Sequence, residues 1–396
     1  MKARLLPAFA LLLALVVSLA VRGSAQTAGA PYELNAILPL TGPFAFFGQA
    51  SQKTMTLVQD RVNKTGGIHG RPVHVVFLDD QSSPQQSVQF ANQLIAKKVP
   101  VMLGPAVTAT CGAVAPLVAA NGPLMFCISP YINTGGYVYA TAGTALDNAV
   151  VVLRYYRERG FKRFAMLNST DASGAALDKA FIDAFALHEN TGLSLVSHEY
   201  FNPTDQSVAA QMAQIKAASP QVLISWTVGS PFSTVVRGFH DSGLDIPLVT
   251  NGANMTIAQI QQLASIAPKE LHFLTIPAAV KGSAVPPRIA KVEHDFDTLF
   301  EENGLKPDGG YANAYDMTIL VMDALRKVPP DPTAAQLHAY FSHLHDWPGA
   351  NAIYDFRFGE RGSGQDGFEL ARFNAAASDF EPISKPGGAP LRIHVP

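Results

Sequence analysis

The residues best suited to bind a ligand lie in a short loop, residues 105–110 (PAVTAT), between a predicted strand at 99–103 and a predicted helix at 112–120. The first N–H groups of a helix have no partner within the helix, and the helix dipole adds positive potential there, so such a loop favours an anion. Thr108 and Thr110 add hydroxyl donors, although hydroxyls at this place also commonly cap the helix. The loop therefore predicts an anion-binding site, in which each threonine is either a ligand contact or a cap.

Sequence patterns of hydrolytic or metal-dependent chemistry are missing. The chain has no GxSxG elbow, no HExxH helix and no metal-spaced cysteines. His338, His343 and His345 cluster near a predicted helix end, but no cysteine or carboxylate pattern completes a zinc site, so they are interpreted as exposed helix residues. We expect no catalytic residue, no metal and no cofactor.

A glycine-rich segment, residues 359–367 (GERGSGQDG), contains the string GxGxxG. A dinucleotide-binding loop must follow a strand and open a helix, so that the pyrophosphate meets the helix amino terminus. Here strands are predicted on both sides, at 352–358 and 368–373. The segment is therefore predicted to be a hairpin turn and not a cofactor site.

Length and charge narrow the class of protein. The chain has 396 residues and a formal net charge of −2, which suits two domains and offers no basic stripe. Binding to nucleic acid normally needs such a stripe, so nucleic acid is excluded as a partner.

The amino terminus predicts export. Lys2 and Arg4 precede an apolar run at 5–21, and the small residues 23–25 offer a cleavage site. This is the layout of a secretory signal peptide, with cleavage expected after Ala25. The alternative is a retained anchor, but the run is short for a membrane span and is interrupted by Pro7.

Strands and helices alternate along most of the chain, which predicts parallel sheets with helices on both faces. The pattern begins near residue 34, starts again after a strand at 137–141, and gives way to three successive helices. Those helices are expected at 287–303, 311–327 and 334–345. The prediction is two doubly wound α/β domains.

The two cysteines suit an oxidising compartment. Cys111 lies at the start of a predicted helix, and Cys127 lies near the end of the next predicted strand, at 124–128. Both places are at the carboxyl edge of a parallel sheet, which favours a disulfide between them. Two buried free thiols are the alternative.

Several motifs together resemble the branched-chain amino-acid (Leu/Ile/Val-type) substrate-binding proteins of ABC importers, from about Tyr32 to the end of the chain. The motifs that carry the resemblance are LPLTGP at 38–43, Gly48, NKTGGI at 63–68, GRPV at 70–73, Asp79-Asp80, the segment 104–116 and GYANAYD at 310–316.

The resemblance implies two Rossmann-like doubly wound lobes joined by three crossover strands, the type I periplasmic binding protein fold. The crossings are expected near Thr141, Ile276 and Tyr354. Lobe one would then comprise residues 32–141 plus 277–350, and lobe two residues 142–276 plus 351–396.

The resemblance also places a ligand site in the cleft between the lobes. Thr108 falls where the family holds the α-carboxylate of its ligand, and Phe47 aligns with a ligand-covering aromatic residue. Phe44 and Phe46 are interpreted as packing residues. Trp226 is interpreted as a core residue. The expected ligand-binding residues are Phe47, Val107, Thr108, Tyr131, Asn133, Asp171, Ser173, Thr227 and Asn251. Asn133 is equally a turn residue, and Asp171 is also a helix N-cap.

Two positions depart from the amino-acid binders. Ser173 stands in TDASG, where the family commonly carries a tyrosine that covers the ligand, and Asn251 stands where an acidic residue would pair with the ligand ammonium. A buried ammonium without a carboxylate is costly. We therefore expect a carboxylate without an α-amine, such as an aromatic or aryl-aliphatic acid.

The expected function is that of a periplasmic solute-binding component, a monomer that closes by a hinge on a small-molecule carboxylate and delivers it to the membrane permease of an ABC importer. A periplasmic sensor with the same fold and a binder of branched-chain or other amino acids are the alternatives, and an exported hydrolase is the enzyme alternative.

Overall fold

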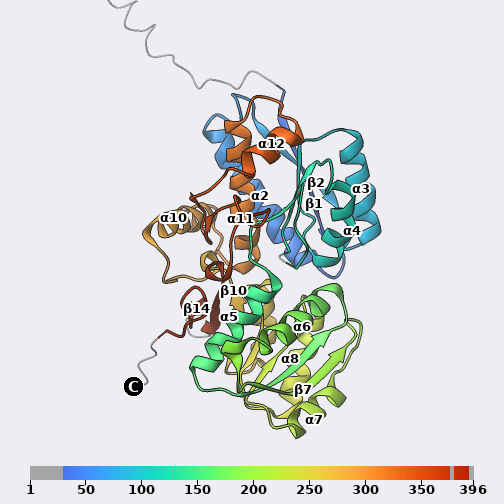
Figure 1. The fold of residues 1–396 in the computed structure, drawn as a ribbon, viewed down its shortest axis with the longest axis vertical. Coiled ribbons are helices and arrows are strands. Elements are labelled where there is room, and N and C mark those ends of the chain that lie inside the picture. Colours follow the sequence, from blue (N-terminus) through green and yellow to red (C-terminus); the bar gives the residue numbers. More distant parts are fainter. Residues whose placement is uncertain (1–29, 130, 375–378, 392–396) are drawn as a thin grey trace, which may run out of the picture.

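A computed structural model describes residues 30–129, 131–374 and 379–391, which form two lobes stacked along the long axis of the molecule (Figure 1). The predicted signal peptide, residues 1–25, lies outside the described residues. No helix within the described ranges is long and apolar enough to cross a membrane.

The first lobe is built on a five-stranded parallel sheet in the order β2-β1-β3-β4-β5. Apart from the edge strand β2, its strands consist mostly of buried apolar residues, as expected for a parallel sheet that is covered on both faces. They are β1 (Tyr32–Leu38), β2 (Val73–Asp79), β3 (Val101–Leu103), β4 (Leu124–Cys127) and β5 (Val138–Ala140).

Helices cover both faces of this sheet (Figure 1). On one face, α3 (Pro84–Ala96) and α4 (Thr108–Val118) pack against side chains such as Ile37 and Met125. On the other face lie α2 (Ala45–Lys64), α11 (Gly309–Lys327) and α12 (Ala334–Phe341), and α10 (Pro287–Glu301) packs beside them. Helix α3 begins as its sequence predicts, because the Ser83 hydroxyl accepts from the Gln86 amide and Pro84 follows the cap. The late helices thus complete the first lobe.

The second lobe is built on a seven-stranded sheet in the order β14-β13-β10-β9-β8-β6-β7. Five strands are parallel, and β13 and β14 are antiparallel to their neighbours. The strands are β6 (Arg163–Ser169), β7 (Ser194–Phe201), β8 (Val222–Ile224), β9 (Leu248–Asn251), β10 (Leu271–Thr275), β13 (Glu369–Asn374) and β14 (Asp379–Pro382).

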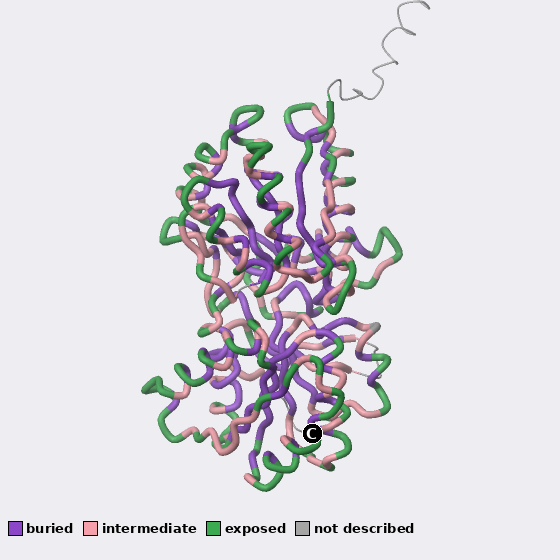
Figure 2. The backbone as a smooth tube through the Cα atoms, turned by 90° about the vertical axis from the view of Figure 1, so that its right-hand side faces the viewer, coloured by how far each residue is buried: buried purple, intermediate pink, exposed green. Residues whose placement is uncertain are grey.

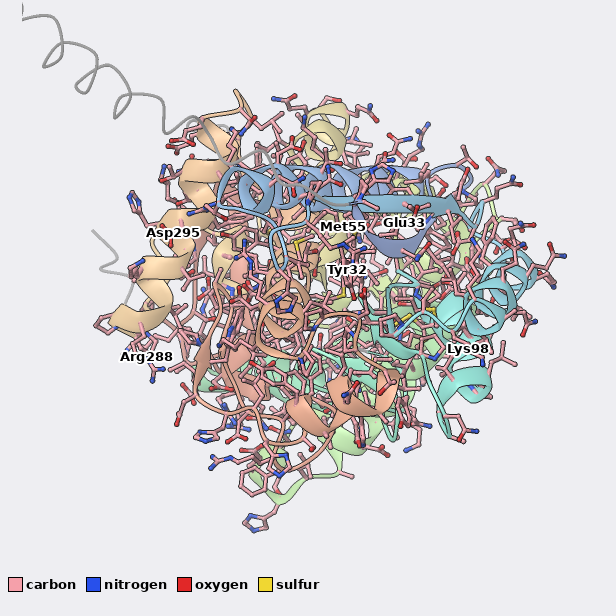
Figure 3. All side chains as sticks on the ribbon, turned by 90° about the horizontal axis from the view of Figure 1, so that it is seen from above. Tyr32, Glu33, Met55, Lys98, Arg288 and Asp295 are labelled. Carbon is pink, nitrogen blue, oxygen red and sulfur yellow. A yellow bond between two sulfur atoms is a disulfide. The ribbon has the colours of Figure 1, made fainter. Side chains whose placement is uncertain are left out.

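This sheet is also covered on both faces. Helices α5 (Ala145–Glu158) and α6 (Ala172–Phe185) lie on one face, and α7 (Ala209–Ala217) and α8 (Ser230–Ser242) lie on the other. Helix α9 (Ile257–Leu263) follows β9. In both lobes the buried backbone gathers along the strands (Figure 2). Seen from above, Met55 of α2 lies inside, whereas Lys98 and Arg288 lie near the rim (Figure 3). The predicted fold class, two doubly wound α/β lobes, is confirmed.

Three segments of the described chain pass between the sheets: after β5, after β10, and between β12 (Ile353–Tyr354) and β13. The first and third segments contact each other through a parallel bridge between Ala140 and Arg361. The second segment contacts Asn351, which lies just before β12 at the entry to the third, and whose side-chain oxygen accepts from the Ala278 amide at 3.2 Å. The three segments therefore form one joint. The lobe boundaries expected at residues 141, 276 and 354 stay predictions.

Asp316 of α11 anchors this joint. Its buried carboxylate accepts from the backbone amides of Ala350 and Asn351 at 2.7 and 2.9 Å, from the Asn351 side-chain amide at 2.8 Å and from the Tyr354 hydroxyl at 2.7 Å. Burial raises the pKa of this carboxyl, and the four donors favour its charged form. One side chain thus fixes the residues that enter the third crossing.

The disulfide expected between Cys111 and Cys127 is present, with the two Cα atoms 6.0 Å apart. It joins the first turn of α4 to the last residue of β4. The amino terminus of α4 is therefore tied covalently to the carboxyl edge of the first sheet.

The predicted hairpin around residues 359–367 is wrong. β12 pairs with β11 (Trp347–Pro348), whereas β13 pairs with β10 and β14. The glycine-rich segment is instead part of the third crossing and contains a short 3-10 turn, η4 (Gln365–Gly367). Alternating apolar residues on both sides of a turn indicated strands, but they carried no information on which strands pair.

We predict that Asp316→Ala lowers the free energy of unfolding by about 2–5 kcal/mol, because it leaves four buried donors without their acceptor. Chemical denaturation of the variant and the wild type measures the change. Asp241→Ala, at an exposed position on α8, is the control and should change stability by less than about 0.5 kcal/mol. Equal losses in the two variants would contradict the anchoring role.

Candidate functional site

A cavity of about 150 Å³ lies between the lobes, at the facing carboxyl ends of the two sheets. Seven of the nine predicted ligand-binding residues line it: Phe47, Val107, Thr108, Tyr131, Asp171, Ser173 and Asn251. The carboxyl edge of a doubly wound sheet is where loops leave backbone groups free for a ligand. The structure thus brings most of the predicted site together.

The start of α4 forms the polar end of the cavity. Val107 is the N-cap residue, with an extended backbone and no side-chain cap, and Thr108 is the first residue of the helix. The Cys111 amide is bonded to the Val107 carbonyl, so the amides of residues 108–110 precede the first helical bond. Thr108 and Ala109 line the cavity, which places these amides and the helix dipole at its wall.

A pair of hydroxyls adds a donor at the same place. The Thr108 Oγ1 and Ser129 Oγ atoms are 2.8 Å apart, and the Tyr131 amide donates to Ser129 Oγ at 3.3 Å. Two hydroxyls that share one hydrogen bond use only one of their two protons. The second proton is therefore left for an acceptor on a ligand. Sequence reasoning missed Ser129, although it follows β4 at the same sheet edge.

Gly104 lets the chain turn from β3 into this loop. Its φ is +79°, and a Cβ at this position would lie 2.3 Å from the Ile37 carbonyl oxygen. Only glycine fits such a backbone position without displacing β1. Thr110 does not line the cavity; its hydroxyl donates to the Val107 carbonyl at 3.0 Å, which makes it a structural residue.

The amino terminus of α6 faces the same cavity from the second lobe, but two of its first three amides are occupied by its own N-cap. Asp171 is its N-cap, and Oδ1 of the carboxylate accepts from the Ser173 and Gly174 amides, both at 2.9 Å. Gly174 lies so close to β6 that a Cβ would approach the Ser169 carbonyl to 1.9 Å. Of the two helix ends, α4 is therefore the one that an anionic ligand can cap.

Tyr131 bridges the two lobes. Its hydroxyl accepts from the Trp226 indole N–H at 3.2 Å and donates to the Asn148 side-chain oxygen at 3.3 Å. Tyr131 belongs to the loop after β4, Trp226 follows β8, and Asn148 lies in α5. Burial raises the pKa of this phenol, which keeps it a neutral donor. Trp226 is fully buried, as predicted for a core residue.

Asn251 supports the second-lobe wall. Its side-chain amide donates to the Thr227 carbonyl at 2.9 Å, and its oxygen accepts from the Ala253 amide at 2.9 Å. Thr227 follows β8 as expected; it is buried and is not among the residues that line the cavity, so its ligand contact stays a prediction.

The ligand contact predicted for Asn133 also stays a prediction. Asn133 lies outside the cavity, in a wider groove of about 1220 Å³ between α4 and α6. Thr108, Ala109, Tyr131 and Ala172 line both the cavity and the groove, so the groove is continuous with the cavity mouth.

Aromatic and aliphatic side chains form most of the remaining wall. Phe44, interpreted from the sequence as a packing residue, lines the cavity together with Phe47. Helix α2 starts at Ala45, which places Phe47 in its first turn. Sequence reasoning also missed Asn148, Thr275, Asn313 and Phe368, which come from four separate elements.

Charge is scarce at this site. Among the described residues that line the cavity, Asp171 is the only one with a charged side chain. No group of three or more His, Cys, Asp or Glu side chains within the described ranges is arranged to hold a metal ion. The site therefore offers backbone amides, hydroxyls and one carboxylate around an apolar interior.

Two doubly wound lobes with a cavity between their facing sheet edges define a two-lobed ligand-binding protein. The family model described as periplasmic binding protein matches residues 31–378. The chain belongs to the periplasmic binding protein family, whose members are binding proteins and not enzymes.

Relatives by sequence carry names of amino-acid binders. The chain is 27% identical to Leu/Ile/Val-binding protein homolog 3 of Brucella melitensis, over 69% of this chain and 75% of that protein. It is 24% identical to the leucine-, isoleucine-, valine-, threonine- and alanine-binding protein of Pseudomonas aeruginosa, over 58% of this chain and 63% of that protein.

Solved structures confirm the fold. A type 1 periplasmic binding protein from Bordetella pertussis has a TM-score of 0.77 and 20% identity, and the match covers 91% of this chain and all of that one. The branched-chain amino acid transporter substrate binding protein LivJ from Streptococcus pneumoniae, in complex with isoleucine, has a TM-score of 0.74 and 17% identity over 89% of this chain and 99% of that one.

We predict that Tyr131→Phe weakens the contact between the lobes, because it removes the hydroxyl that joins Trp226 to Asn148. The chain has two tryptophans, so a Trp347→Phe background isolates the emission of Trp226. In that background Tyr131→Phe should shift the Trp226 emission and lower stability by about 1 kcal/mol. Tyr200→Phe, on an exposed tyrosine of β7, is the control. Unchanged emission and stability would show that the bridge is absent in solution.

Proposed function

We propose that this protein is the periplasmic solute-binding component of an ABC importer, a monomer that captures a small carboxylate between its lobes and delivers it to a membrane permease. The observation that carries the proposal is the uncapped start of α4, which opens into the cavity beside the Thr108–Ser129 hydroxyl pair. A carboxylate supplies the acceptors that this helix end lacks. The names of the amino-acid-binding relatives support import as the role.

The rest of the cavity favours an apolar body on the ligand. Phe44, Phe47 and Phe368 line it, and Ser173 leaves space where the resembled family commonly carries a tyrosine. Asn251 carries no charge, and its amide and oxygen already serve Thr227 and Ala253. An ammonium beside Asn251 would meet no charge from this side chain. The preferred ligand is therefore an aromatic or aryl-aliphatic acid without an α-amine.

A second candidate, an α-amino acid ligand, rests on Asp171. Both capping hydrogen bonds end on its Oδ1 atom, which leaves Oδ2 to accept from an ammonium. Capping the helix and binding a ligand are thus compatible for this side chain. The two candidates differ in whether affinity depends on the Asp171 charge.

We predict that ligand-free protein binds benzoate- or cinnamate-type acids more tightly than leucine, isoleucine or valine. Thermal shift measurements with this panel rank the ligands, since a ligand present at about 100 times its Kd stabilises the folded state by about 2.7 kcal/mol. Calorimetry of the best acid should show that Thr108→Val weakens binding about 10- to 100-fold, the effect of losing a hydrogen bond to a charged group. Thr110→Val is the matched control with little effect. Tight leucine binding together with no binding of any acid would overturn the ligand class.

We further predict that Asp171→Asn leaves the affinity for the preferred acid unchanged, because asparagine caps a helix about as well as aspartate. If the ligand is an α-amino acid, the same substitution weakens its binding at least about tenfold, since a charged partner is lost. Calorimetry of the variant with the best acid and with leucine separates the two candidates. A large loss of acid affinity would contradict the carboxylate orientation proposed here.

A further inference from the structure

A second buried carboxyl, that of Glu369, lies directly behind the cavity. Glu369 is the first residue of β13 and is fully buried at 0% exposure. Its neighbour Phe368 lines the cavity, and so does Thr275, the residue opposite it on β10. Glu369 therefore sits where the second crossing leaves the sheet of the second lobe.

The partner of Glu369 is Ser283, in the segment that leads from β10 to α10. The Ser283 hydroxyl lies 3.1 Å from the Pro277 carbonyl oxygen and 3.1 Å from the Val280 carbonyl oxygen, and it also contacts Oε1 of Glu369. One hydroxyl proton cannot serve three acceptors well. The Ser283–Glu369 contact gains its own proton when Ser283 donates to a backbone carbonyl and a protonated Glu369 donates to Ser283.

The other oxygen of Glu369 supports the same protonation state. Oε2 is buried and has no hydrogen-bond partner among the described residues, and the same holds for Oε1 of Glu293 on α10. A buried carboxylate oxygen without a donor is costly, whereas a neutral carboxyl tolerates the site. Burial raises the pKa of Glu369 to about 8; the Ser283 hydrogen bond acts to lower this pKa, and the nearby Glu293 acts to raise it.

The charged groups around Glu369 and Glu293 would not offset negative charges on both carboxyls. Glu293, whose pKa burial raises to about 8, faces Asp297 of the same helix and Asp316 of α11. The nearest lysine of the second crossing, Lys281, pairs with Glu301 at 3.2 Å, and Lys306 pairs with Asp379 of β14 at 3.0 Å. On β10 the residue opposite Glu369 is the uncharged Thr275.

We propose that Glu369 is a carboxylic acid in the ligand-binding form of the protein, and that loss of its proton frees the 277–283 segment of the second crossing. The neutral acid ties this segment to β13 through Ser283. The carboxylate form has no proton to donate, so Ser283 must turn its own proton to Glu369 and release the Pro277 and Val280 carbonyls, and the new charge faces Glu293. Because Phe368 and Thr275 line the cavity, the wall of the ligand site then responds to pH through a residue that does not touch the ligand.

The sign of the pH dependence follows from the proton count. Between about pH 4.5 and about 8 the folded protein keeps a proton on Glu369 that the unfolded chain has lost. The proton on Glu369 contributes fully to stability below about pH 4.5, and this contribution is lost as the pH rises toward about 8. Glu369→Gln keeps the neutral hydrogen-bonding shape and removes the titration.

The test compares the pH profiles of unfolding for wild type and Glu369→Gln, with Glu302→Gln at the exposed end of α10 as the matched control. The stability of Glu369→Gln relative to wild type should increase steadily as the pH rises from about 5 to about 8. The control should stay parallel to the wild type. Parallel profiles for all three proteins would overturn the proposal.

A measurement on the wild type alone keeps the proposal testable if Glu369→Gln does not fold. Amide hydrogen exchange in residues 277–283, corrected for the intrinsic effect of pH, should be several-fold faster at about pH 9 than at about pH 6. Residues of β1, in the core of the first lobe, provide the internal reference. Equal corrected exchange of the segment at the two pH values would likewise overturn the proposal.

Discussion

The backbone amides at the start of α4 are the constraint on which the rest of the site depends. A helix end without a side-chain cap needs an acceptor from solvent or from a ligand, and Val107 supplies none. The surrounding structure holds this end in place through the Cys111–Cys127 disulfide, the turn at Gly104 and the contact between Thr108 and Ser129. The corresponding end of α6 carries its own carboxylate cap, so the polarity of the cavity runs from α4 to Asp171.

The two lobes are joined so that a structural change at the cavity can reach the three crossing segments. Tyr131 contacts the second lobe directly, and the three crossing segments contact one another through Ala140, Arg361 and Asn351. Asp316 fixes the entry to the third crossing with four hydrogen bonds. Glu369 lies beside the second crossing segment. The crossings therefore differ in their chemistry: one carries a carboxylate with four donors, and the other lies beside a carboxyl whose second oxygen has no hydrogen-bond partner among the described residues.

The sequence predicted the α/β lobes well, because alternating strands and helices with start signals such as Ser83-Pro84 are local features. It also predicted the disulfide, since two parallel strand ends share one edge. Strand pairing near the carboxyl terminus failed, because the alternation of residues 352–373 did not reveal that β13 pairs with β10. For the site, Thr108 was indicated by the loop after a strand together with the family resemblance, and Asp171 by the resemblance, and both line the cavity. Ser129, Asn148 and Phe368 were missed, because only the folded chain brings their separate elements to one cavity.

The most direct test of the central claim is a crystal structure of the protein with the tightest-binding acid of the panel. The account predicts that the ligand carboxylate accepts from the amides of residues 108–110 and from the Thr108 or Ser129 hydroxyl, with the apolar part against Phe44, Phe47 and Phe368. A ligand whose carboxylate points to the second lobe, or an acid bound outside the cavity while the start of α4 meets only water, would contradict it.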